Sequence, residues 1–124
     1  MKKKIAIGVL ILLVLIQFIP VDTTNPTVDT QKDFIVITKA PQEVAQILKT
    51  SCYDCHANET AYPWYFKVAP VSWWLKNHLN EGRRELNFST WGDYTAKRKD
   101  KKMKESIKMV QEGEMPMWSY TLVH

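Results

Sequence analysis

The sequence predicts an all-α domain behind an apolar N-terminal segment, and three observations support this fold class. Apolar residues recur at helical spacing in three stretches after residue 40, and no stretch alternates apolar and polar residues as a half-buried strand would. Proline or glycine stands at the borders of these stretches, where helices begin and end. The length of 124 residues leaves room for one small domain. We therefore divide the chain into an N-terminal signal or anchor (1–20), a tether (21–39) and a helical domain (40–124).

The N-terminal segment has the composition of an export signal or a membrane anchor. Lys2, Lys3 and Lys4 precede an apolar run, residues 5–19. As a helix this run would extend roughly 22 Å, less than the ~30 Å hydrocarbon core of a bilayer. Because no small-residue cleavage site follows, we expect an uncleaved anchor, with a cleaved signal as the alternative. The positive-inside rule then places the rest of the chain on the translocated side.

The net charge of the chain is a poor guide to a nucleic-acid partner. The sequence has 17 basic and 13 acidic residues, a formal charge of +4. Three of the basic residues belong to the N-terminal segment, so the remaining chain carries 14 basic against 13 acidic residues, or +1. A body this close to neutral, on a chain with an export signal, gives no support to nucleic-acid binding.

The tether and three helices follow in order. Residues 21–39 are rich in Thr and Asp and have no helical period, although Phe34–Ile37 could lie against the domain as a short extended piece. Beyond them the apolar period and the borders predict three helices: Pro41 to about Ser51, Pro70 to about Leu86, and Ala96 to about Glu112, with Gly113 ending the last.

The domain is unusually rich in tryptophan for its size. Large flat side chains in so small a domain indicate that it encloses something large and apolar. A domain of this length is also marginal in stability unless something staples it. The five tryptophans are Trp64, Trp73, Trp74, Trp91 and Trp118.

The segment Cys52-Tyr53-Asp54-Cys55-His56 has the C-x-x-C-H pattern of a c-type haem attachment site. Two thiols at this spacing can reach the two vinyl groups of one porphyrin, and the adjacent imidazole then points at the iron. Three alternatives have less support. A thioredoxin-like redox pair follows a strand, a zinc site needs two further ligands, and a disulfide here would close only a very small loop.

From Cys52 onward the sequence resembles the bacterial haem-binding domain family, small membrane-anchored proteins similar to cytochrome c. The matching segments are Cys52–His56, Tyr62–Tyr65, Pro70–Leu75, Glu81–Ser89, Glu112–Pro116 and Ser119–His124. The resemblance implies a small cytochrome-c-like helical domain with one haem c, held covalently through Cys52 and Cys55, at the periplasmic side of the inner membrane. Family members usually continue with another helix beyond the position of His124.

Several histidines and methionines are candidates for binding the haem iron. We expect His56 to bind the iron and Met115, in the irregular stretch after Gly113, to be the sixth ligand, with Met117 as the alternative. His78 is expected to pack among the tryptophans, bis-His ligation being the rival arrangement, and His124 to be a terminal residue or a propionate contact. Trp64 and Trp74 are expected to contact the haem.

These features predict an electron carrier rather than an enzyme, because no catalytic triad, paired carboxylates or phosphate-binding loop is present. Lys97–Lys104 carries six basic residues in eight. We expect a solvated helix face there, or alternatively a docking surface for an acidic redox partner. Two other functions stay open: a haem-based sensor, small-ligand binder or peroxidase-like subunit with an open sixth position, and a redox or metal module without haem.

Overall fold

The computed structural model of the chain describes residues 1–123, and these contain helices and irregular segments but no strand. The α-helices are α1 (Lys2–Leu15), α2 (Phe34–Thr38), α3 (Gln42–Ser51), α4 (Tyr53–His56), α5 (Val71–Glu85), α6 (Ala96–Gln111) and α7 (Trp118–Thr121). Short 3-10 helices are η1 (Ile16–Phe18), η2 (Thr30–Lys32), η3 (Trp64–Lys67) and η4 (Phe88–Asp93). The all-α class is therefore confirmed for the described part of the chain.

The three helices predicted from periodicity are α3, α5 and α6, and their ends have local causes. Pro41 and Pro70 directly precede α3 and α5, where the missing proline N–H costs nothing. The Thr95 hydroxyl accepts a hydrogen bond from the Arg98 N–H at 3.3 Å and caps the start of α6. Just beyond α6, Gly113 has a φ of +72°, which a glycine adopts without strain.

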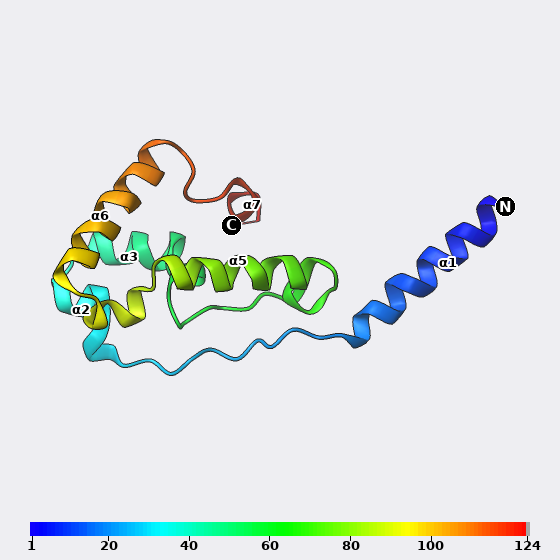
Figure 1. Cartoon of the computed structure of the whole chain (residues 1–124), viewed down its shortest axis with the longest axis horizontal. Coiled ribbons are helices and arrows are strands. Elements are labelled where there is room, and N and C mark those ends of the chain that lie inside the picture. Colours follow the sequence, from blue (N-terminus) through cyan, green and yellow to red (C-terminus); the bar gives the residue numbers. More distant parts are fainter. Residues whose placement is uncertain (124) are drawn as a thin grey trace.

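Helix α1 stands away from the rest of the chain, and its apolar residues are exposed (Figure 1). In the part of the chain that the structure describes, no helix combines the length and the apolarity needed to cross a membrane. The chain just after α1, in η1 and at Ile19, is nevertheless tied to the domain. The Gln17 side-chain amide donates to the Ala69 carbonyl and accepts from the Ala69 N–H, both at 3.0 Å, and the Trp73 indole donates to the Ile19 carbonyl at 3.0 Å.

The segment between α1 and α3 runs along one side of α5 before it turns into η2 and α2 (Figure 1). Its backbone is held by side chains of the domain, such as the Asn58 amide, which donates to the Thr27 carbonyl at 3.2 Å. The extended piece expected at Phe34–Ile37 is instead a helix, because the Asp33 carboxylate caps it by accepting from the Ile35 N–H at 2.8 Å. The division of the chain at residues 20 and 39 stays a prediction.

The hydrophobic core lies between α2, α4 and η4, on one side of the C-x-x-C-H segment. The Tyr53 ring stacks on Phe88 with ring centroids 5.2 Å apart, and the edge of Phe34 meets Trp91 at 4.9 Å. Such pairs contribute beyond their buried area. The first residue between the two cysteines is thus part of the core, and it anchors the motif. The buried cluster consists of Phe34, Tyr53, Ala57, Leu86, Phe88 and Trp91.

The apolar faces of α3 and α6 have the predicted helical spacing but remain largely exposed. On α3, Val44 is 45% and Ile47 is 63% exposed. On α6, Ile107 is 53% and Val110 is 60% exposed. Helical periodicity therefore predicted these helices correctly, whereas the core of the described chain is built mainly by shorter elements.

Candidate haem site

The C-x-x-C-H segment forms one helical turn, α4, that follows α3 with only Cys52 between them. The turn closes through a hydrogen bond from the His56 N–H to the Cys52 carbonyl at 2.9 Å. Its orientation is set by Tyr53, whose hydroxyl donates to the buried Asp33 carboxylate, with both oxygens 3.0 Å away. Burial and the Asp33 charge raise the pKa of Tyr53, so the phenol stays a neutral donor.

Helix α5 passes so close to α4 that only glycine fits at the crossing. A Cβ atom on Gly82 would lie 2.8 Å from the Cys55 carbonyl oxygen. Because the obstacle is backbone, it cannot move aside as a flexible side chain would. Gly82 thus permits the contact that brings the C-terminal half of α5 against the motif.

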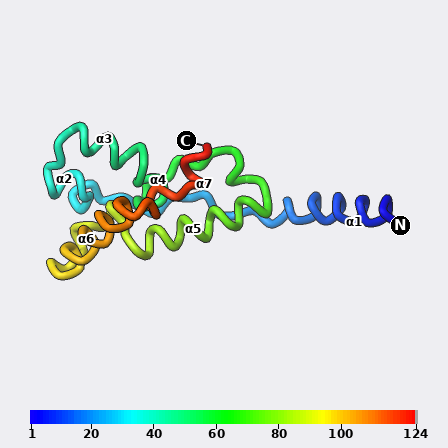
Figure 2. The backbone as a smooth tube through the Cα atoms, turned by 90° about the horizontal axis from the view of Figure 1, so that it is seen from above, coloured from blue at the N-terminus to red at the C-terminus, as the bar shows by residue number. Residues whose placement is uncertain are grey.

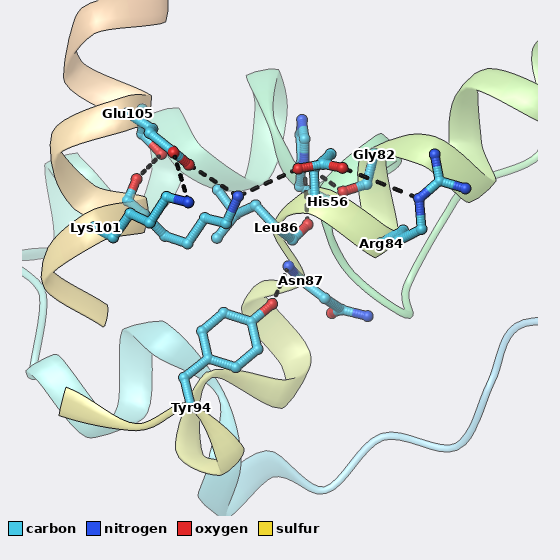
Figure 3. Close-up of polar contacts among 11 residues, drawn as sticks. His56, Gly82, Arg84, Leu86, Asn87, Tyr94, Lys101 and Glu105 are labelled. Atoms are coloured by element: carbon cyan, nitrogen blue, oxygen red, sulfur yellow. Dashed lines mark hydrogen bonds and ion pairs between the residues drawn. The ribbon is translucent and has the colours of Figure 1, made fainter. Parts of the chain in front are cut away.

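This contact determines which nitrogen of His56 carries the proton. The Nδ1 atom lies 3.0 Å from the carbonyl oxygens of both Gly82 and Leu86 (Figure 3). Both neighbours are acceptors only, so Nδ1 carries a proton, and in the neutral imidazole Nε2 is then the nitrogen with the lone pair. A carbonyl bonded to one ring nitrogen is the usual way in which proteins prepare the other nitrogen for a metal.

The two cysteines are free thiols, each half-buried. Burial raises the pKa of the Cys52 thiol. Burial, and then the charge of Asp54, raise the pKa of the Cys55 thiol. Both groups are therefore protonated at neutral pH, and they do not have the lowered pKa of a redox-active C-x-x-C pair.

An apolar groove with a volume of about 80 Å³, partly open to solvent, lies beside the motif between α4, α5, η3 and α7. This volume is below the ~300–1,000 Å³ typical of small-molecule sites, so a planar cofactor bound here would extend beyond the groove or widen it. Cys55 is one of its lining residues, so the motif borders an apolar space. Its other large lining side chains include Tyr65, Phe66, Trp74, Leu75, His78, Leu79, Met117 and Tyr120.

The structure brings some of the predicted site residues together and leaves others apart. Cys55 and Trp74 line the groove, whereas Trp64 is 76% exposed and is not part of the lining. Of the two methionines considered as the sixth ligand, Met117 lines the groove and Met115 does not. His78, predicted to pack among tryptophans, contacts the Trp74 ring at 4.4 Å and also lines the groove. His124 lies outside the described residues.

Cys52 and His56 flank the groove rather than line it. Cys52 is the N-cap residue of α4, and Cys55 and His56 are its last two residues, so one helical turn joins all three. Among residues 1–123, no group of three or more His, Cys, Asp and Glu side chains is arranged to hold a metal ion.

Sequence reasoning did not find the role of Arg83. Its guanidinium donates to the Ala57 carbonyl at 2.9 Å, to the Thr60 hydroxyl at 2.8 Å and to the Asn25 amide oxygen at 2.8 Å. It therefore clamps the loop after His56 to the segment that precedes η2. The available signal was the neighbouring Gly82, because a glycine inside a helix is costly unless a close approach requires it.

A family model described as a haem-binding domain matches residues 11–124. The chain belongs to the haem-binding domain family. The match includes the C-x-x-C-H turn, all of α5 and the described part of the C-terminal segment, so it supports haem binding and confirms the resemblance found in the sequence. No curated protein and no solved structure is significantly similar to the chain.

The donor set of this haem-binding domain fits a haem. One helical turn carries two neutral thiols and an imidazole whose Nε2 has a free lone pair, and an apolar, aromatic-lined groove adjoins it. His56 would bind the iron, the two thiols would bind the porphyrin edge, and side chains such as Trp74 would cover its apolar face.

Proposed function

We propose that this haem-binding domain is a mono-haem c-type electron carrier. The haem would be held covalently by Cys52 and Cys55, and His56 Nε2 would bind its iron. The observation that carries the proposal is the position of His56 Nδ1 between two carbonyl oxygens, which leaves Nε2 as the nitrogen available to iron. Bound haem would supply a one-electron couple between ferric and ferrous iron.

The thiols are suited to covalent attachment because they are neutral and reduced. Each would add across one vinyl group: the sulfur forms a bond to one vinyl carbon and the thiol hydrogen goes to the other. This addition needs no oxidant. The protein's remaining task is to exclude water and set the reduction potential through ligands and burial.

We propose that the sixth ligand comes from the segment Met115–Met117. Sequence reasoning favoured Met115, whereas the groove wall supports Met117. Replacing each methionine separately by alanine distinguishes them. A thioether on ferric haem gives a weak long-wavelength absorption band, and the variant that loses this band identifies the ligand.

A docking surface for acidic partners is proposed at the start of α6. Further along the helix, basic side chains are paired: Lys102 bonds Glu85 and Glu105, and Lys101 also reaches Glu105 (Figure 3). Lys97 and Arg98, nearer the start of the helix, border an open surface hollow whose other basic residues are Arg84, Lys101 and Lys102 and whose one acidic residue is Glu85. Such a patch accelerates encounter with anions. Replacing Lys97 and Arg98 by Glu should slow oxidation of the reduced protein by ferricyanide but not by a cationic oxidant.

We propose that the protein acts at the periplasmic face of the inner membrane, to which the N-terminal segment directs it. Support comes from Lys2, Lys3 and Lys4, followed by a helix whose apolar side chains are exposed. Fractionation of cells that produce the whole chain tests this: the protein should remain with the membranes after a salt wash and be digested by protease added to spheroplasts.

A haem-based sensor or small-ligand binder is the alternative function, and the groove gives it one specific argument. His78 Nδ1 lies 2.9 Å from the Trp74 carbonyl, so its Nε2 also has a free lone pair on a groove-lining side chain. Such a group could hydrogen-bond a small ligand on the iron. Under this alternative, cyanide would bind the ferric protein without displacing a protein ligand.

The optical spectrum of protein produced with cytochrome c maturation machinery tests the proposal. We expect a six-coordinate low-spin spectrum that His56→Ala abolishes and the matched variant His78→Ala preserves. Loss of the spectrum in His78→Ala, with His56→Ala unchanged, would overturn the assignment of the axial histidine.

A further inference from the structure

The C-terminal segment returns across the haem-attachment turn, and one side chain ties it there. After α6 the chain turns at Gly113 and forms α7, which lies next to α4 (Figure 2). Within the segment the hydrogen bonds are local, such as that from the Thr121 N–H to the Met117 carbonyl at 3.1 Å. Tyr120, by contrast, reaches residues that are 66 and 70 positions earlier.

The Tyr120 hydroxyl makes contacts at both ends of the junction between α3 and α4. It lies 3.0 Å from the Thr50 carbonyl and 3.0 Å from Asp54 Oδ2. Asp54 is itself held by the loop that follows α4, since its other carboxylate oxygen accepts from the Ala61 N–H at 3.3 Å. A hydrogen bond to a carboxylate is stronger than one between neutral groups. Burial and the nearby Asp54 raise the pKa of Tyr120, which keeps the phenol a donor.

This tie sets the position of one wall of the groove. Helix α7 and its flanks contribute Met117 and Tyr120 to the lining, and α5 contributes Trp74 and His78. Asp54 directly precedes Cys55 in the chain. The contact between Tyr120 and Asp54 therefore couples the wall that carries Met117 to the part of α4 that lines the groove.

We propose that Tyr120 is a positioning residue that holds α7 closed against the haem-attachment turn. Its hydrogen bonds keep Met117 at the groove and restrict the entry of external ligands. This inference rests on the proposed haem function, and it adds a specific determinant of access that the C-x-x-C-H motif does not contain.

The test replaces the hydroxyl alone, in Tyr120→Phe. The matched control is Tyr62→Phe, whose hydroxyl makes only a long contact of 3.5 Å to the Thr24 carbonyl and does not line the groove. Each variant is produced with the maturation machinery, and covalent haem is first verified by mass. Cyanide binding to the ferric protein is then measured, with amide hydrogen exchange of residues 117–123 as a second readout that does not depend on haem chemistry.

We expect Tyr120→Phe to bind cyanide about ten-fold faster or more, as the loss of a hydrogen bond to a charged group implies. Exchange in α7 should accelerate, and the thioether absorption band should weaken. Tyr62→Phe should match the wild type in all three measurements. Unchanged cyanide binding and unchanged exchange in Tyr120→Phe with haem attached would overturn the proposal.

A second variant covers the case in which Tyr120→Phe does not fold. Asp54→Ala removes the carboxylate acceptor but leaves the Thr50 carbonyl, and it should also accelerate cyanide binding. Asp54→Ala with wild-type access would overturn the proposal as well. Absence of covalent haem in the wild-type protein would instead contradict the proposed function itself, so the two failures are distinguishable.

Discussion

Removal of the Tyr53 hydroxyl is the most direct test of how the C-x-x-C-H turn is anchored. The Tyr53 side chain is 4% exposed, and Asp33, whose carboxylate it contacts, is 7% exposed. In Tyr53→Phe the ring can keep its stacking on Phe88, so packing changes little. The Asp33 carboxylate accepts hydrogen bonds from the Tyr53 hydroxyl and the Ile35 N–H, and in Tyr53→Phe it keeps only the second, in a region largely closed to water.

The expected loss follows from the charge of the acceptor. Hydrogen bonds to charged groups contribute about 1.5–3 kcal/mol, and a buried carboxylate left without its donor loses at least this much. For a domain of this size, each kcal/mol lowers the Tm by roughly 4–8 °C. We therefore expect Tyr53→Phe to lower the Tm by about 6 °C or more.

Thermal and urea unfolding, followed by far-ultraviolet circular dichroism, measures this loss. Tyr62→Phe is the matched control, and it should change the free energy of unfolding by less than about 0.5 kcal/mol. Asp33→Ala completes a double-mutant cycle with Tyr53→Phe, and we expect a coupling energy of about 1 kcal/mol or more. If Tyr53→Phe costs no more than Tyr62→Phe, or the coupling energy is near zero, the proposed anchor is wrong.

Three further predictions concern α4 and its neighbours. Gly82→Ala would place a Cβ 2.8 Å from a carbonyl oxygen of α4, and the overpacking should lower the free energy of unfolding by about 1–3 kcal/mol, partly offset by about 1 kcal/mol of helix propensity. Gly8→Ala, which has open space around it, is the control and should not lower stability. Equal thermal stability of the two variants would count against the close contact. Burial raises the pKa of both motif thiols, so in folded, haem-free protein at neutral pH they should react with iodoacetamide more slowly than in the same protein unfolded in urea. The two rates should approach each other only at alkaline pH. Identical pH–rate profiles for the folded and the unfolded protein would refute this prediction. Arg83→Lys should speed hydrogen exchange in residues 57–60 and lower the free energy of unfolding by about 1–3 kcal/mol, because it loses hydrogen bonds to Ala57 and Thr60. Arg84→Lys is the control and should change neither quantity. Equal behaviour of the two variants would show that Arg83 does not hold this loop.

The long helices were predictable because their signals are local. In α5 and α6 the apolar period extends over several turns, and a proline or a threonine cap marks each start. Helix α2 has five residues and α7 has four, too few for a period to be visible. The cap of α2 by Asp33 depends on a single side chain, which is why the sequence suggested an extended piece there.

The path of residues 21–33 was not predictable for a different reason. Composition suggests a tether, because the segment has no apolar stripe that could pack. It is held instead by polar side chains from far along the chain, such as Arg83, which bonds Asn25 across 58 residues. Such contacts involve single hydrogen bonds and leave no pattern in the sequence.

In the candidate site, too, the features with a local sequence signal were predictable and those that depend on distant contacts were not. Haem binding was predictable because the two thiols and the imidazole of the C-x-x-C-H pattern lie within the five residues Cys52–His56, whereas covalent attachment stays a proposal. Which methionine lines the groove depends on the path of α7, which contacts Asp54 through Tyr120. No local signal in the sequence distinguishes Met115 from Met117, and the identity of the sixth ligand stays a prediction.

The intact mass of the denatured protein tests the central claim most directly. The whole chain is produced together with cytochrome c maturation machinery, and a known c-type cytochrome is matured in parallel as a control. We predict that the wild-type chain gains the mass of one haem, which survives denaturation, and that Cys52→Ala combined with Cys55→Ala gains none. A wild-type chain of unmodified mass with two free thiols, in cells that mature the control, would contradict covalent haem attachment.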